Sequence, residues 1–255
     1  MALFSGSRRR RDGLDGPVFA KPFSDADEDI RVLSDKLETA PPQSKFIFRE
    51  ALDSIREKVR RRSGVVQALS ESDQQVLILC DVRVSGKAGS AKIDFIILGP
   101  SYILAVNVSD LKGHAVTTEA IEFGPRAPYP GVLDSEENAK ILLEALRESG
   151  QLSGKMLRNV WPVLILSDEE EEHSEISGVS FSSDFSSVFP DVRSAQVISC
   201  GALAGLMEAL NGPEYASSEW PPKKLYAMSE YLMNYDTQVT ACPVSYRMQK
   251  KPLFE

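Results

Sequence analysis

The sequence predicts an α/β fold in which a mixed sheet is flanked by helices. Two observations support this class. Three runs of β-branched and aliphatic residues, separated by glycine-containing turns, are typical of a three-stranded meander, and apolar residues recur at helical spacing on both sides of it. Strands lying between helices are expected to form a sheet with helices on its faces. The predicted meander strands are Val76–Val84, Lys92–Leu98 and Tyr102–Val108.

Two helices are predicted before the meander. The first covers Asp27–Leu37, where the apolar residues fall mostly at helical spacing and Ser24 and Asp25 are available as caps. The second covers Ser44–Arg62, where apolar residues follow one another at steps of four, three and four. Those residues, which define one face of the second helix, are Phe48, Leu52, Ile55 and Val59.

The second predicted helix ends in a basic run of Lys58 and Arg60 to Arg62. Positive charge at a helix C-terminus complements the helix dipole, which gives the run a purely structural interpretation. The alternative is a patch that contacts phosphate groups. The sequence leaves both interpretations open and favours the structural one.

Five more elements are predicted after the meander. Apolar residues at helical spacing, with charged residues on the opposite face, predict helices, and short continuous apolar runs predict buried strands. In chain order these are a helix over Asp134–Glu148, a strand over Val160–Leu166, a strand over Ala195–Cys200, and helices over Gly201–Leu210 and from Pro221 to Tyr235.

The chain is predicted to have three parts. Residues 1–25 contain Arg8 to Arg11, several glycines and prolines and little apolar periodicity, so we expect a flexible basic tail. Residues 26–210 hold the predicted sheet and its helices. Residues 211–255 add a C-terminal helix and a polar tail.

Composition points to a cytoplasmic, soluble protein. The N-terminus lacks the apolar run of a secretory signal, and no stretch approaches the length of a membrane-spanning helix. The three cysteines show no metal-type spacing, and Cys80 lies in an apolar strand, where a thiol acts as a small hydrophobic group.

Charge is distributed unevenly along the chain. Residues 1–65 carry 14 Lys and Arg against 11 Asp and Glu, whereas residues 66–255 carry 15 Lys and Arg against 26 Asp and Glu. Most of the chain would therefore repel nucleic acid at long range.

One polar residue interrupts the apolar middle strand of the meander. Asp94 lies between Ile93 and Phe95. A carboxylate at such a position is costly to bury unless it is paired, hydrogen-bonded or bound to a metal. Asp94 is therefore the first candidate for a functional residue.

The meander resembles the nuclease-related domain (NERD), a branch of the restriction-endonuclease-like PD-(D/E)xK superfamily. The resemblance rests on Ile93-Asp94 followed by an apolar run, on the strand Ile103–Ser109 and on Gly113. It extends downstream, since Asp134–Leu146 lies where the family has a helix with an Asn-Pro-Leu-x-Gln motif, and Val160–Leu166 lies where it has its next apolar strand.

The resemblance implies a metal-dependent site that this chain has partly lost. In the family, an Asp and a Glu on adjacent strands bind Mg²⁺, and a Lys two residues after the Glu assists the nucleophile or the phosphate. Asp94 matches the Asp and is the candidate metal ligand. Asn107 stands in the Glu position, Ser109 in the Lys position, and Asn138 aligns with the helix Gln. Losing the Glu removes a full charge from a hard-cation site.

We therefore expect a catalytically degenerate nuclease-related module with no cofactor, and Mg²⁺ only if it is active. Its partner would be a nucleic acid such as DNA or another protein, with no membrane involved. The acidic body favours a protein partner, and the sequence does not specify the oligomeric state. The alternative is a divergent Mg²⁺-dependent DNA nuclease that uses Asp110 and Lys112, just past the strand, and Glu50 on the preceding helix.

Overall fold

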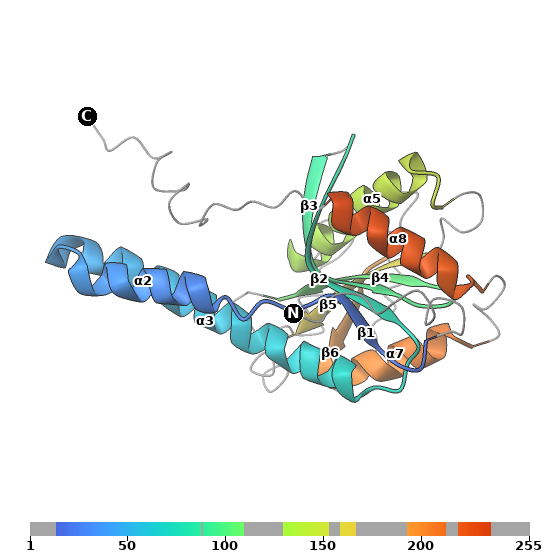
Figure 1. Ribbon diagram of the computed structural model, residues 1–255, viewed down its shortest axis with the longest axis horizontal. Coiled ribbons are helices and arrows are strands. Elements are labelled where there is room, and N and C mark those ends of the chain that lie inside the picture. Colours follow the sequence, from blue (N-terminus) through green and yellow to red (C-terminus); the bar gives the residue numbers. More distant parts are fainter. Residues whose placement is uncertain are drawn as a thin grey trace.

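The chain forms one mixed sheet with helices on both faces, which confirms the predicted α/β class (Figure 1). The computed structural model describes residues 14–87, 89–109, 130–152, 159–166, 193–212 and 219–235. Its six strands lie in the order β1-β2-β3-β4-β5-β6. Their bounds are Val18–Lys21 for β1, Leu77–Gly86 for β2, Gly89–Leu98 for β3, Ile103–Val108 for β4, Val160–Leu166 for β5 and Gln196–Ser199 for β6.

Strands β2, β3 and β4 form the predicted antiparallel meander, and β1 pairs with β2 in parallel. Strands β4, β5 and β6 are parallel to one another. Parallel neighbours need a crossover connection, and between β4 and β5 the chain contains helix α5, Pro130–Glu148. The predicted bounds of β5 are confirmed without change.

Helices α5 and α8 cover one face of the sheet. Helix α8, Pro222–Tyr235, inserts Leu225, Met228 and Leu232 into the same core that α5 lines with Leu142 and Leu146. The C-terminal helix therefore packs into the core of the sheet. The strands supply alternate residues to this face, as the period of two requires. They include Leu77, Leu79, Ile96, Leu98, Ile103 and Ala105.

The other face is covered by α7, Leu203–Leu210, and by the second half of α3, Pro42–Glu71. Val65 and Leu69 of α3 and Met207 of α7 meet the opposite alternate residues of the strands, among them Cys80 and Phe95. Cys80 is fully buried, and burial raises the pKa of its thiol to about 12, which confirms it as a core residue. A short 3₁₀ turn, Cys200–Ala202, precedes α7.

Helix α2, Asp27–Thr39, lies beside the first half of α3, and the two extend away from the sheet as an arm (Figure 1). The N-cap of α2 is Ala26 and not the predicted Ser24 or Asp25, although these two residues accept hydrogen bonds from the amides of Ala26 and Asp27 at 3.3 and 3.2 Å. Leu33 of α2 and Leu52 of α3 are the buried side chains of the arm.

Three sequence-based expectations are wrong. Residues 18–21 were expected in a flexible tail but form strand β1, because β2 offers them a parallel partner that no local pattern reveals. Helix α3 does not end at Arg62 but continues to Glu71. Glu136 was expected on the exposed face of its helix but is buried, where it accepts a hydrogen bond from the amide of Ala195 at 3.1 Å.

Several expectations fall on residues outside the described part of the chain. They are residues 1–13 with Arg8 to Arg11, the site candidates Asp110 and Lys112, Gly113, and the tail after residue 235. Among the described residues, the helices are all too short or too polar to cross a membrane.

Candidate functional site

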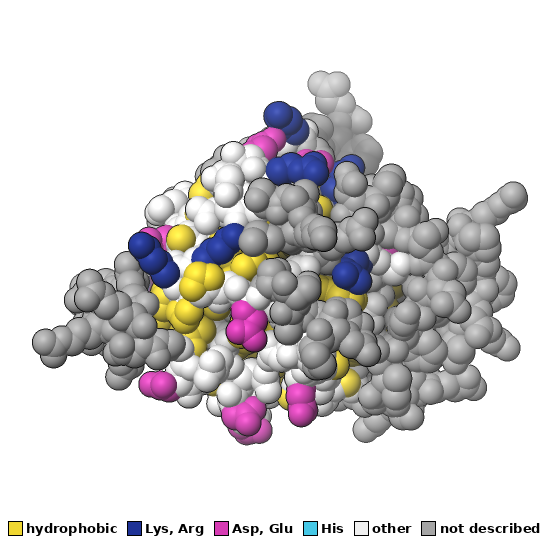
Figure 2. Space-filling view, turned by 90° about the vertical axis from the view of Figure 1, so that its right-hand side faces the viewer, with side chains coloured by type: hydrophobic (Ala, Val, Ile, Leu, Met, Phe, Trp, Pro, Cys, Tyr) yellow, Lys and Arg dark blue, Asp and Glu magenta, His cyan; other side chains and the backbone are white. Residues whose placement is uncertain are grey.

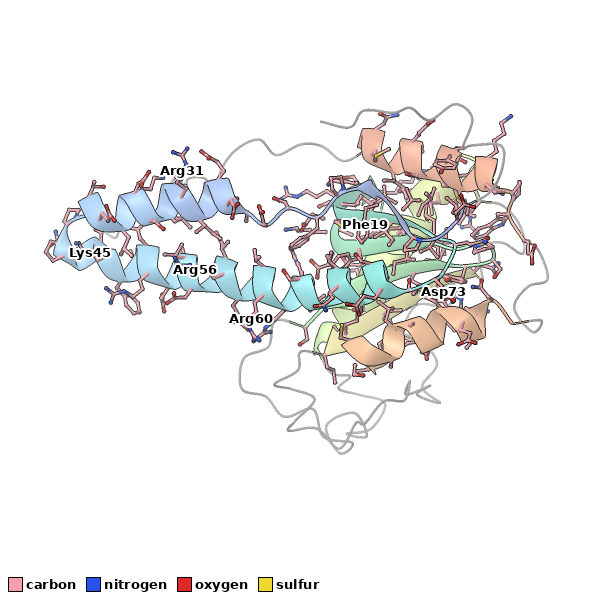
Figure 3. The ribbon with its side chains drawn as sticks, turned by 60° about the horizontal axis from the view of Figure 1, so that its bottom comes forward. Phe19, Arg31, Lys45, Arg56, Arg60 and Asp73 are labelled. Carbon is pink, nitrogen blue, oxygen red and sulfur yellow. The ribbon has the colours of Figure 1, made fainter. Side chains whose placement is uncertain are left out.

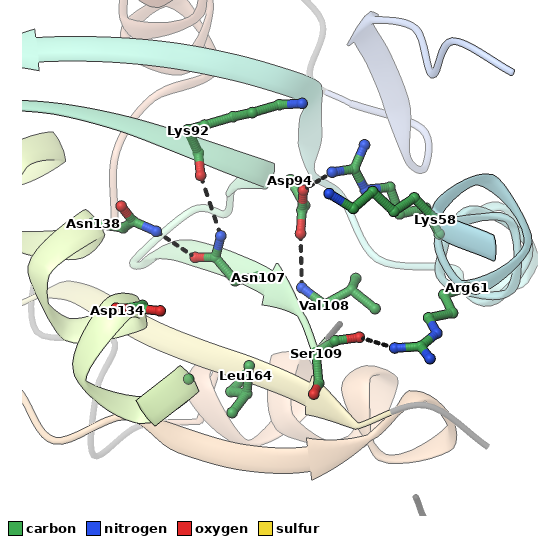
Figure 4. A pocket seen from close by; sticks show the side chains of 12 residues that line it. Lys58, Arg61, Lys92, Asp94, Asn107, Val108, Ser109, Asp134, Asn138 and Leu164 are labelled. Atoms are coloured by element: carbon green, nitrogen blue, oxygen red, sulfur yellow. Dashed lines mark hydrogen bonds and ion pairs between the residues drawn. The ribbon is translucent and has the colours of Figure 1, made fainter. Parts of the chain in front are cut away.

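A pocket of about 270 Å³ opens where α3 and α5 approach the ends of the central strands (Figure 4). It collects every described residue that the sequence analysis assigned to the family motif: Asp94, Asn107, Ser109 and Asn138. Helix α3 adds Lys58, Arg61 and Arg62, strand β3 adds Lys92, and Val108, Gly131, Asp134 and Leu164 complete the lining.

The three cations of α3 reach the pocket because the helix continues beyond them. The basic run lies in the middle of a 30-residue helix, nine residues before its end at Glu71, so it does not complement the C-terminal dipole. The structural interpretation of this run is therefore wrong. Val65 and Leu69, one and two turns later, fix the helix against the sheet and so place Lys58, Arg61 and Arg62 beside the strand ends.

Asp94 is held by two partners inside the pocket. Its Oδ1 accepts a hydrogen bond from Nη2 of Arg62, and its Oδ2 accepts one from the amide of Val108 at 2.8 Å (Figure 4). The residue is 8% exposed. Burial raises the pKa of its carboxyl, while Arg62 and the Val108 amide act in the opposite direction. These two contacts offset the free-energy cost of burying the Asp94 carboxylate.

A second aspartate faces Asp94 across the β2–β3 ladder. Residues 80 and 82 pair with residues 95 and 93, which places Asp81 opposite Asp94. Asp81 has a left-handed backbone, with φ of 52°, a conformation that aspartate tolerates better than most residues. In a regular strand, residues two positions apart lie on the same face of the sheet. Here they do not, because Cys80 and Phe95 belong to the face covered by α3, while Val82 and Ile93 belong to the face covered by α5.

Asp81 was missed by the sequence analysis, although its setting repeats that of Asp94. Both are carboxylates inside an apolar strand, and that repetition is the signal that could have found it. The Oδ1 of Asp81 accepts a hydrogen bond from Nη1 of Arg62 at 2.6 Å and lies 3.6 Å from Nζ of Lys92. Its backbone carbonyl accepts one from Nζ of Lys21 in β1 at 2.6 Å.

Asn107, which the sequence analysis predicts to stand at the position of the family glutamate, is hydrogen-bonded at both ends of its amide. Its Nδ2 donates to the carbonyl of Lys92 at 3.3 Å, and its Oδ1 accepts from Nδ2 of Asn138 at 3.2 Å (Figure 4). Asn138 comes from α5, where it lies four residues after Asp134 on the same side of the helix. The two asparagines thus connect β4 to α5 across the pocket.

Ser109, which the sequence analysis predicts to stand at the position of the family lysine, is buried directly after β4. Its carbonyl accepts a hydrogen bond from Nη1 of Arg61 at 2.7 Å, and its amide donates to the carbonyl of Ile165 at 2.8 Å. Arg61 also donates from Nε to Glu57 at 2.8 Å. Arg60 and Arg61 together lower the pKa of the Glu57 carboxyl to about 2.

The pocket is positively charged in an acidic protein. Four of its lining side chains are cationic, Lys58, Arg61, Arg62 and Lys92, against two carboxylates, Asp94 and Asp134. Burial and the nearby Arg62 lower the pKa of Lys92, while Asp81 and Asp94 raise it. On the described part of the face remote from the arm, Lys and Arg side chains lie among Asp and Glu side chains, which occur near the top, in the middle and along the lower edge (Figure 2).

The side chains present do not fit a resident Mg²⁺ ion. Mg²⁺ requires oxygen ligands in near-octahedral geometry, usually including carboxylates. Both oxygens of Asp94 are engaged, Asn107 replaces the second carboxylate, and cations outnumber carboxylates around the pocket. Within the described ranges, three or more His, Cys, Asp or Glu side chains do not gather at any point where they could hold a metal.

The residues of the alternative active site do not assemble here. Glu50 is exposed on the arm and does not line the pocket. Asp110 and Lys112 lie outside the described residues. The residues that the sequence analysis did not assign to this site are Lys58, Arg61, Arg62 and Lys92, of which the three on α3 belong to the run whose helix was predicted too short.

Comparison with known proteins supports the resemblance seen in the sequence. Neither the curated proteins nor the solved structures include a significant match to this chain. One family model does match, that of the nuclease-related domain, over residues 60–167. This range contains Asp94, Asn107, Ser109 and Asn138, together with the end of α3 and β5. The restriction-endonuclease-like fold is the general fold of that family, and residues 60–167 are the part of the chain that matches it.

Proposed function

We propose that this nuclease-related domain binds the phosphodiester backbone of a nucleic acid without cleaving it. The observation that carries the proposal is the convergence of four cationic side chains on one pocket in a chain of net charge −8. A phosphate group is the ligand that such a cluster favours, since Lys and Arg contacts to phosphates provide most of the sequence-independent affinity for nucleic acids.

The four cations have different tasks. Arg61 is paired with Glu57, and Arg62 with Asp81 and Asp94, so the protein itself balances their charge and holds their side chains in place. Lys92 retains a side chain that is 51% exposed, and Lys58 is exposed on α3, so these two are the ones that contact a phosphate directly. The amides of Asn107 and Asn138 add polar groups next to them.

Loss of cleavage follows from the same residues. A metal-dependent phosphodiesterase uses carboxylates to hold the cation that activates water and stabilises charge on the phosphate. Here the position of the family Glu is Asn107, whose amide is engaged with Asn138, and the position of the Lys is Ser109. Neither replacement provides the charge that the reaction needs.

The test measures binding of a fluorescently labelled oligonucleotide of about 20 nucleotides by anisotropy, between roughly 50 and 200 mM salt. We expect binding that weakens as salt rises, and affinity lowered about tenfold or more in the double variant Lys58→Glu/Lys92→Glu, with a shallower salt dependence.

The matched control is Lys45→Glu/Arg56→Glu, which changes the net charge equally on the arm but outside the pocket (Figure 3). Arg56 and Lys58 are two residues apart on α3, so they project from opposite sides of the helix. Retained affinity in Lys58→Glu/Lys92→Glu, equal losses in both double variants, or absence of binding at the lowest salt would each overturn the proposal.

A further inference from the structure

Arg62 lies between Asp81 and Asp94, the two aspartates that stand opposite each other on strands β2 and β3. Its two terminal nitrogens are divided between them, Nη1 on Asp81 and Nη2 on Asp94. The guanidinium is planar and presents its donors in a fixed fork, which suits the bridging of two carboxylates. The side chain is 15% exposed, and those of Asp81 and Asp94 are 23% and 10% exposed, so all three are largely shielded from water.

We propose that the Arg62 guanidinium is a resident cation that takes the place of a divalent metal between Asp81 and Asp94. The two carboxylates alone would form a divalent-cation site, because they are partly buried, adjacent in the ladder and oriented toward a common point that Arg62 occupies. Arginine stays protonated throughout the accessible pH range, so this cation is permanent.

The charged groups around this site balance one another, so the site has no net negative charge to attract an added metal ion. Asp81 and Asp94 contribute two negative charges, and Arg62 and Lys92 contribute two positive charges next to them. Lys21 donates to the carbonyl of Asp81 from the other side. A dication entering this neutral group would have to displace a guanidinium that is hydrogen-bonded to both of its ligands.

The neighbouring arginines of α3 do not share this arrangement. Arg60 and Arg61 both bind Glu57 of the same helix, and the side chain of Arg60 is 50% exposed. Arg62 is thus distinguished by its contact with two carboxylates from two different strands. Its hydrogen-bond partners are groups of the protein itself, whereas Lys58 and Lys92 are the side chains proposed to contact a phosphate directly.

The experiment measures binding of Mn²⁺ alone, from the decrease in the electron paramagnetic resonance signal of the free ion. Four full-length proteins are compared: wild type, Arg62→Ala, Arg62→Ala/Asp94→Asn, and the control Arg60→Ala. We expect wild type and Arg60→Ala to leave the signal unchanged, Arg62→Ala to bind Mn²⁺ at least about tenfold more tightly than wild type, and the double variant to lose that gain.

Stability provides a second readout if Arg62→Ala folds poorly. Without Arg62 the two carboxylates repel each other, so Mn²⁺ should raise the melting temperature of Arg62→Ala, and of Arg62→Met, which keeps the apolar stem, but not of wild type. Mn²⁺ binding by wild type that Asp94→Asn abolishes would overturn the proposal. Failure of Mn²⁺ to bind or to stabilise the Arg62 variants would overturn it as well.

Discussion

The two halves of helix α3 lie in different surroundings. After residue 60 the helix packs Val65 and Leu69 against the sheet and turns cations toward the pocket. Before it, the helix pairs with α2, buries Leu52 and leaves Phe46 and Ile47 exposed on the arm (Figure 3). The match to the nuclease-related domain begins at residue 60. The arm is therefore an addition to the matched domain, and the candidate site lies where the two halves meet.

The largest difference between the two halves of α3 is expected when the buried leucine of each half is truncated to alanine. Leu69→Ala removes a fully buried side chain between α3 and the sheet and should lower the free energy of unfolding by about 2–5 kcal/mol. Leu52→Ala should cost about half as much, because a two-helix arm collapses around the lost volume more easily than a sheet core does. Urea unfolding of both variants measures the difference, and equal losses would mean that the arm is as tightly packed as the body.

A smaller effect is expected from Glu57, at the junction of the two halves. Its pKa is lowered from 4.5 to about 2 by Arg60 and Arg61, so its ion pairs stabilise the fold above pH 4.5 and this contribution disappears as pH falls from 4.5 toward 2. Glu57→Gln should therefore reduce the free energy of unfolding by about 1 kcal/mol at pH 6 and by much less near pH 2. Thermal unfolding at both values measures this, with Glu50→Gln on the arm as the control. If Glu57→Gln lowered the free energy of unfolding equally at both pH values, the stabilisation would not come from the ion pairs of Glu57.

The smallest effect is expected at the exposed apolar side chains of the arm. Phe46 and Ile47 are 64% and 50% exposed, so Phe46→Ser and Ile47→Ser should each change the free energy of unfolding by less than about 0.5 kcal/mol. Urea unfolding of the two variants and the wild type measures this change. A loss near that of Leu52→Ala would show that these side chains are buried in solution and that the two halves of α3 differ less than the structure indicates.

The fold could be predicted largely from local patterns, because its strands and helices are amphipathic or continuously apolar. Strand β5 and the start of α2 fall at the predicted residues. Strand β1 could not be found in this way, since four residues of mixed character form a strand only when β2 lies beside them. Buried Glu136 was missed for a related reason: its partner is the amide of Ala195, 59 residues away.

Asp94 could be predicted from its place in an apolar strand, and the rest of the predicted site from a family pattern. That pattern pointed to Asp94, Asn107, Ser109 and Asn138, which meet at one pocket. Arg62 was not assigned to the site because its helix was predicted to end at Arg62, whereas the helix continues to Glu71. Val65 and Leu69 extend the apolar spacing of the helix and could have signalled the continuation.

The central claim is that the pocket holds a phosphodiester without metal and without cleaving it. The most direct measurement is the affinity of the wild-type protein for a labelled oligonucleotide in EDTA and in Mg²⁺, followed by electrophoresis of the recovered strand. We predict that Mg²⁺ does not raise the affinity and that the strand stays intact, because the cations of the site are side chains of the protein. Cleavage that requires Mg²⁺ and disappears in Asp94→Asn would contradict the claim.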